Sequence, residues 1–134
     1  MSIGAMARNA MYLEGYAASA ISAYLCVMGS PRLIALPSAV SSPVYGVTAE
    51  DIAAAGRGNV QTSGVAICTA GEEISQAAIN AGARVYAGTD GKVYLWDAAA
   101  GVNQAVVGIP LLAASGDGKL TEVLLGAGGI GQGA

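Results

Sequence analysis

The side chains that most often carry chemistry are scarce in this chain. Histidine is absent from the 134 residues, which removes the commonest general base and the commonest metal ligand. Adjacent carboxylates remain at Glu50-Asp51 and Glu72-Glu73. Both pairs stand beside expected turns, where acids usually face water or a helix N-terminus. We therefore expect no catalytic residues, no metal site and no cofactor.

A glycine-rich segment, residues 126–131, reads Gly-Ala-Gly-Gly-Ile-Gly and satisfies G-x-G-x-x-G. In a dinucleotide site this fingerprint works because a helix follows it and offers its N-terminal amides to the pyrophosphate. Only three residues follow here. We interpret the match as accidental.

The two cysteines, Cys26 and Cys68, lie inside apolar runs and have no cysteine at metal-ligand spacing. Buried cysteine behaves as a small hydrophobic residue. We expect two reduced buried thiols, with a disulfide between them as the alternative.

Composition predicts a surface that is shared with other proteins. Hydrophobic residues make up 54% of the chain and charged residues only 11%, about half the share typical of soluble domains. A partner or further copies of the chain would cover such a surface. Because the six basic residues are scattered and the net charge is −3, we expect no nucleic-acid partner.

The longest uncharged run lies between Glu14 and Arg32, and glycine, serine and proline dilute it. A spanning helix needs roughly 20 predominantly apolar residues, so we expect no membrane partner. Arg8 before an apolar stretch leaves a signal peptide as an alternative, although Glu14 interrupts that stretch.

Alternating strands are clearest in residues 79–126. Residues 81–86 and 92–96 flank a Gly-Thr-Asp-Gly turn, which predicts a β-hairpin. A second pair, residues 105–109 and 120–125, flanks a turn at residues 116–119. Together they predict a compact all-β unit.

The two faces of the predicted hairpin differ in composition. Small and aliphatic side chains share one face by the period of two, and we assign that face to the core. The other face carries the only tryptophan, which favours a contact surface, or else aromatic pairs that merely cover the strands. The candidate contact residues on this face are Arg84, Tyr86, Tyr94 and Trp96, with Lys92 beside them.

An earlier segment follows the same pattern as this unit. Gly46 and Gly108 are separated by the same 62 positions as Gly64 and Gly126. The fold class we predict is therefore all-β, a small barrel or sandwich of two loosely similar units with short helical turns, with an internal duplication of residues 21–64 and 79–126. Chance similarity in a chain rich in glycine, alanine and valine is the rival interpretation.

Both ends of the chain look extended. Residues 1–20 show no clean period and predict an N-terminal arm before a β domain at residues 21–125, and residues 126–134 predict a glycine-rich tail. A frayed terminus is the alternative for the arm. Its large apolar residues favour contact with a neighbouring subunit: Met6, Met11, Tyr12 and Tyr16.

In order and spacing, several short motifs resemble one family. They are Val44-Tyr45-Gly46-Val47, the acidic and alanine-rich turn at residues 50–56, residues 60–65, residues 80–86, residues 90–93 and residues 106–109. Over residues 21–125 this pattern resembles the head-decoration, or capsid cement, proteins of tailed phages. Pro110-Leu111-Leu112 departs from the usual polar stretch, and the arm is longer and more apolar than the family pattern.

The resemblance implies a structural virion protein, not an enzyme, made in the host cytoplasm and bound to the capsid exterior. Its partners would be the major capsid protein and further copies of itself, as a trimer in preference to a dimer. Two alternatives stay open: another virion β-domain, such as a tail or neck subunit, and a small secreted β-barrel that binds a ligand.

Overall fold

The computed structural model describes residues 10–97 and 104–126. Within these ranges it is an all-β protein with one short helix, α2 (Gln76–Asn80), as the alternating runs of the sequence predict. The strands are β1 (Tyr12–Ala17), β2 (Cys26–Ser30), β3 (Leu33–Ala35), β4 (Gly46–Thr48), β5 (Gly56–Gln61), β6 (Val65–Thr69), β7 (Val85–Ala87), β8 (Val93–Leu95), β9 (Val106–Pro110) and β10 (Leu120–Leu125).

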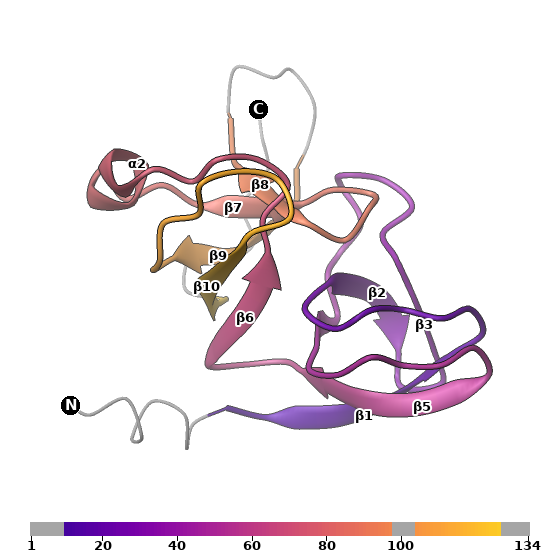
Figure 1. Ribbon diagram of the computed structural model, residues 1–134. Helices are drawn as coiled ribbons and strands as arrows, with labels where there is room; N and C mark the ends of the chain where they lie inside the picture. The colour runs from indigo at the N-terminus through magenta and orange to yellow at the C-terminus, as the bar shows by residue number, and fades with distance from the viewer. Residues whose placement is uncertain (1–9, 98–103, 127–134) are drawn as a thin grey trace.

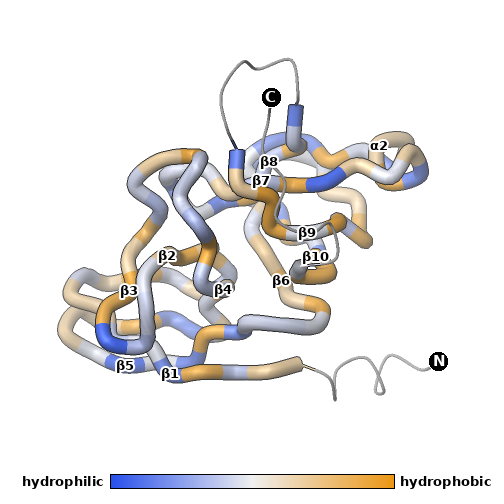
Figure 2. Tube along the Cα trace, turned by 180° about the vertical axis from the view of Figure 1, so that it is seen from behind, coloured by the Kyte–Doolittle hydropathy of each residue, from blue (hydrophilic) through white to orange (hydrophobic). Residues whose placement is uncertain are grey.

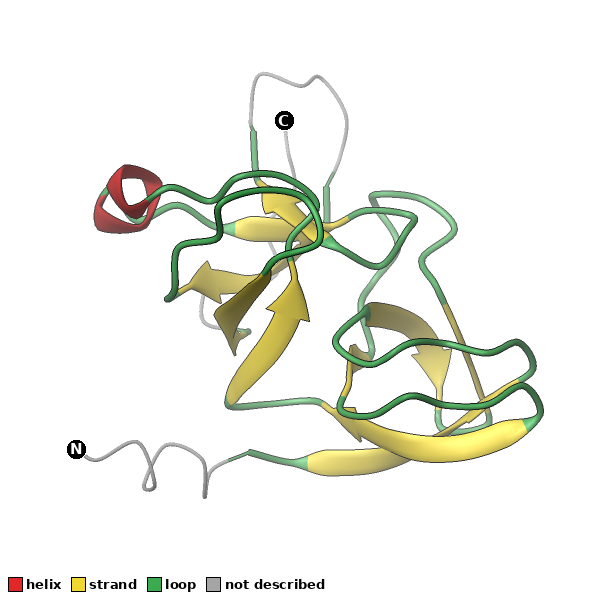
Figure 3. Cartoon of the chain, in the orientation of Figure 1, coloured by secondary structure: helices red, strands yellow, loops and turns green. Residues whose placement is uncertain are grey.

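The strands form two five-stranded sheets that lie side by side (Figures 1 and 3). The first closes into a barrel in the order β1-β3-β2-β4-β5, and the second has the order β6-β10-β9-β7-β8. Reading the first from β1 through β5 gives β1-β5-β4-β2-β3, which is the order of the second with every strand number lowered by five. The predicted fold of two similar β units is confirmed.

A parallel pair also recurs at matching places in the two units. In the first unit Ala17 of β1 pairs with Ile34 of β3, and in the second an isolated bridge joins Ala70, just after β6, to Val93 of β8. The predicted duplication placed its first copy at residues 21–64, whereas the first unit begins earlier, at β1. That the two units arose by duplication stays a prediction.

Strand β1 lies inside the segment that the sequence assigned to an arm. It pairs antiparallel with β5 along its whole length, from Tyr12 opposite Gln61 to Ala17 opposite Gly56. Its inward side is made of small residues, so the sequence shows no apolar alternation. A Cβ on Gly15 would lie 2.9 Å from Ile34 Cδ1, so the strand approaches the core closely there. Residues 1–9 of the predicted arm, including Met6, and residues 127–134 of the predicted tail lie outside the described residues.

Gly64 joins the two units. Strand β5 ends at Gln61 in the first sheet, and β6 begins at Val65 in the other sheet. Gly64 has φ +81°, a left-handed conformation that glycine adopts without steric cost. The turn at Gly64 therefore carries the chain from one sheet to the other.

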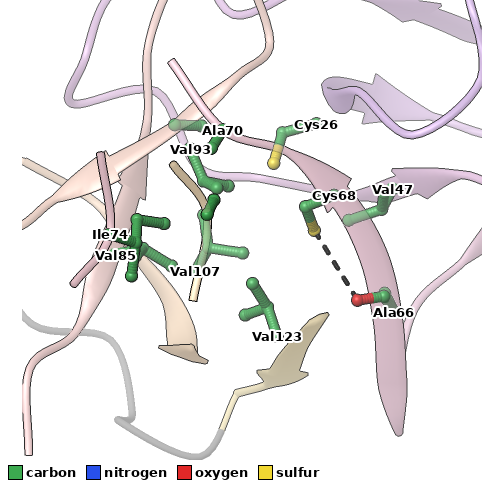
Figure 4. Close-up of a cluster of buried hydrophobic side chains, with 12 residues drawn as sticks. Cys26, Val47, Ala66, Cys68, Ala70, Ile74, Val85, Val93, Val107 and Val123 are labelled. Atoms are coloured by element: carbon green, nitrogen blue, oxygen red, sulfur yellow. Dashed lines mark hydrogen bonds between the residues drawn. The ribbon is translucent and has the colours of Figure 1, made fainter. Parts of the chain in front are cut away.

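The two units share core residues. One buried cluster contains Cys26 and Val47 from the first unit among residues of the second (Figure 4). Backbone bonds also cross between the units: Thr69 N donates to Tyr24 O at 2.9 Å, and Cys26 N donates to Gly91 O at 2.8 Å. The units are therefore packed as one body.

Candidate functional site

The predicted aromatic hairpin is formed by β7 and β8. Val85 pairs with Leu95 and Tyr86 with Tyr94, so the sequence predicted the two faces correctly. Val85 is fully buried, and the rings of Tyr86 and Tyr94 stack with centroids 5.7 Å apart. The two tyrosines of the aromatic face therefore form a packed cross-strand pair, and a partner could contact this pair only from its outer side.

Tyr94 is held from three sides. Its hydroxyl donates to Asp90 Oδ2 at 2.6 Å, and a Cβ on Gly71 or Gly88 would lie 2.2 Å or 2.5 Å from atoms of its ring. The bond to the Asp90 carboxylate raises the pKa of Tyr94, and burial adds to this. Burial is the first cause that raises the pKa of Tyr86. Both phenols are therefore harder to ionise than a free tyrosine.

Arg84 and Trp96 stand at the far end of the same face. Trp96 N donates to Arg84 O at 2.8 Å, which extends the hairpin by one pair. Arg84 is exposed and Trp96 is half-buried. Among the described residues, Trp96 Nε1 is buried and has no hydrogen-bond partner. An arginine beside a half-buried tryptophan is a composition that contact surfaces favour.

The candidate residues on β1 lie elsewhere. Met11 and Tyr12 are 57% and 53% exposed, and the Arg57 guanidinium lies 5.6 Å from the centre of the half-buried Tyr16 ring. In Figures 1 and 2, β1 lies at the bottom of the molecule and β7–β8 at the top. The structure therefore divides the predicted contact residues between two surfaces.

Three of the four paired carboxylates hold backbone amides. Glu50 Oε2 accepts from Asn59 N at 2.8 Å, and Asp51 Oδ1 accepts from Ala23 N at 2.7 Å. Glu72 Oε2 accepts from Leu95 N at 2.8 Å at the outer edge of β8. These acids fix loops and cover a strand edge, which explains their positions without catalysis.

The cysteines are free and fully buried between the units. Figure 4 shows both thiols inside the shared cluster. Cys26 and burial together raise the pKa of Cys68 well above its ordinary value. The Cys68 thiol therefore resists ionisation and is unreactive in the folded chain.

Sequence reasoning missed an apolar surface on the second sheet. The outward side chains of β6, β10 and the end of β9 are almost all aliphatic, and Figure 2 shows apolar colour along these strands. The available signal was the run Leu111-Leu112, which stood out as a departure from the family pattern. A sheet that is apolar on both faces needs a partner on the outer one.

A cavity of about 290 Å³ lies where the loop before β4 meets β9 and the end of β10. Its lining residues carry no charge. Tyr45 is among them, and its buried hydroxyl has no partner among the described residues. In the described ranges no cluster of three or more acidic, cysteine or histidine side chains could hold a metal ion. No described helix is both long and apolar enough to cross a membrane.

The family profile of phage cement proteins matches residues 9–126, which covers both units. The chain belongs to the phage cement protein family. This cement protein is thus a phage structural protein, and the resemblance found in its motifs is confirmed.

A solved structure shares its fold. The head fiber gp8.5 N base in bacteriophage phi29 superposes with a TM-score of 0.64 at 19% sequence identity, over 87% of this chain and 93% of that chain. No curated protein matches the cement protein by sequence.

Proposed function

We propose that this protein binds the outer surface of an assembled phage capsid and stabilises the shell. Its membership of the phage cement protein family is the observation that carries the proposal. The fold shared with a head fiber base supports attachment to a phage head. The major capsid protein would be its partner, and the protein would be made in the host cytoplasm and carried on the exterior of the virion.

The surface of the chain supports association. Eight large hydrophobic side chains are at least 40% exposed among the described residues, in a chain with only 11% charged residues. A cement protein adds many identical contacts over a lattice, so each contact can be weak. We assign a homo-oligomer, a trimer in preference to a dimer, with neither nucleic acid nor membrane as partner.

The aromatic hairpin face is our candidate for the capsid contact. Arg84 is exposed, Trp96 is half-buried, and Tyr86 is fixed by its stack on Tyr94. A rigid aromatic surface with an arginine loses little conformational entropy on binding. Because Glu72 covers the edge of β8, contact would use the face of the hairpin and not its edge.

The test is binding to purified capsids that lack the protein. We expect it to co-sediment with empty heads, to appear above the shell by electron microscopy, and to raise the temperature at which heads release DNA. Arg84→Glu should weaken binding by roughly tenfold or more. The matched control is Arg32→Glu, the same charge reversal at an exposed residue on the other unit.

Two outcomes would contradict the proposal. Binding to purified tails but not to heads would make the protein a tail or neck subunit. Loss of N-terminal residues from the mature protein, with a bound small molecule, would favour the secreted barrel.

A further inference from the structure

The outer face of the second sheet is an apolar surface that nothing in the described structure covers. Strand register places the outward residues of the three strands opposite one another, with Leu124 between Val65 and Ile109, and Glu122 opposite Ile67. The surface, which we call the β6–β10–β9 face, consists of Val65, Ile67, Thr69, Leu120, Glu122, Leu124, Ile109 and Leu111.

The β6–β10–β9 face contains one charged side chain, Glu122, among mostly aliphatic residues. Ile67 is 43% exposed and Leu120 is 47% exposed, while Cys68 and Val123 on the inner side are fully buried. Glu122 is exposed and lies at the middle of β10. A partner that fits the face must therefore bring apolar side chains and one cation.

The start of the chain has that composition. Residues 1–13 include four large aliphatic or thioether residues before Tyr12, and Arg8 is their only charge. Met11, Tyr12 and Leu13 are 57%, 53% and 40% exposed, so the fold of their own chain does not use these side chains.

The start of β1 cannot move onto the β6–β10–β9 face of its own chain. Met11 N donates to Ser63 Oγ at 3.1 Å, and Met11 O accepts from Thr62 N at 2.8 Å. From Tyr12 onward, six consecutive pairs with β5 hold the strand in the first unit. Its exposed side chains are therefore available to another molecule.

We propose that the β6–β10–β9 face binds residues 1–13 of a second copy of this chain, with Arg8 of that copy beside Glu122. The inference rests on the homo-oligomer in the proposed function and names the two surfaces that join. In a pair of copies joined this way, one β6–β10–β9 face and one N-terminal segment stay unoccupied. Further copies can therefore add until a closed ring forms. A trimer is such a ring.

The first experiment measures the mass of the full chain in solution by light scattering and sedimentation, without capsids. Ile67→Glu changes the face, Tyr12→Glu changes the segment, and Leu33→Glu is a control of similar exposure outside both. We expect each of the first two to raise the dissociation constant at least roughly tenfold and the control to leave it unchanged. Far-ultraviolet circular dichroism equal to that of wild type establishes that the variants fold, since losing a contact between copies lowers the melting temperature by itself.

Mixing separates this contact from a symmetric one. Ile67→Glu retains an intact segment and Tyr12→Glu an intact face, so an equimolar mixture should form dimers that neither forms alone. Arg8→Glu and Glu122→Arg should each weaken association, and the double variant should recover it. No dimer in the mixture, or no recovery in the double variant, would overturn the proposal.

Failure here is distinguishable from failure of the cement function. A monomeric wild-type chain that still binds heads overturns the contact between copies alone. An oligomer that Ile67→Glu leaves intact, but whose binding to heads is lost, assigns the face to the capsid and also overturns the inference.

Discussion

Replacing Gly108 by alanine tests how closely the strands of the second unit approach. A Cβ at this position would lie 2.1 Å from Leu124 O and 2.9 Å from its carbonyl carbon. Cβ contacts under 3.0 Å are essentially never observed, so β9 and β10 must separate by about 0.9 Å, the difference between 3.0 and 2.1 Å. The obstacle is backbone, which cannot rotate away as a side chain would.

The expected loss follows from this displacement. Overpacking of a core costs about 1–3 kcal/mol of stability. The hydrogen bond from Gly126 N to Val107 O beside the site, 2.9 Å long, would also weaken, at a further cost of about 1 kcal/mol. We expect Gly108→Ala to lower the free energy of unfolding by about 2–4 kcal/mol, out of a total of about 5–15 kcal/mol. Gly46→Ala, at the matching position of the first unit, should cost about 1–3 kcal/mol because its nearest atom, Gln61 O, is 2.5 Å away.

Urea unfolding followed by the fluorescence of Trp96, the only tryptophan, measures both losses. Gly116→Ala is the control, since no atom lies within 4 Å of a Cβ there, and it should stay within about 0.5 kcal/mol of wild type. If Gly108→Ala matched this control, the close packing of β9 on β10 would be refuted.

Two further predictions concern single hydroxyl groups. The buried Thr48 Oγ1 donates to Ser22 O at 2.8 Å and accepts from Leu25 N at 3.1 Å. Thr48→Val should therefore lower the free energy of unfolding by about 1–3 kcal/mol in the same urea assay. A loss equal to that of the exposed Thr89→Val would contradict this prediction. The pKa of Tyr94 is raised above 10.0 in the fold, so its contribution is complete below pH 10 and falls as pH rises further. As pH rises from 10 to 11.5, Tyr94→Phe should therefore lose less stability than wild type. An equal fall in the melting temperatures of the two proteins over this range would contradict the prediction.

The hairpins could be predicted because their determinants are local. An Asp-Gly turn between alternating runs fixes β7 and β8, and the faces follow from a period of two. In the sequence, the repeated strand order left only one clear trace: Gly46 and Gly108, and likewise Gly64 and Gly126, are separated by 62 positions. The two units have the same strand order but little sequence in common. Glycine is needed at 46 and 108 because a neighbouring carbonyl oxygen occupies the space of a Cβ at both.

Strand β1 and the β6–β10–β9 face could not be predicted because their determinants are tertiary. Gly15 and Ala17 supply the inner side of β1, and small residues give no apolar alternation to detect. Alternation also fails for β10, where Leu120, Leu124 and Leu125 occupy both faces. A strand that is apolar on both sides is recognised only when its neighbours are known.

The shared cluster around Cys26 and Cys68 has a mechanical consequence. Both units supply residues to this buried cluster. Although the two units have the same strand order, we expect that cutting the chain at Gly64 would leave neither unit with a complete core. The barrel and the second sheet are thus held in one fixed arrangement, so we expect the described part of the chain to behave as a single rigid body. Any partner bound at β1 and any partner bound at the β7–β8 hairpin would therefore be held at a constant separation.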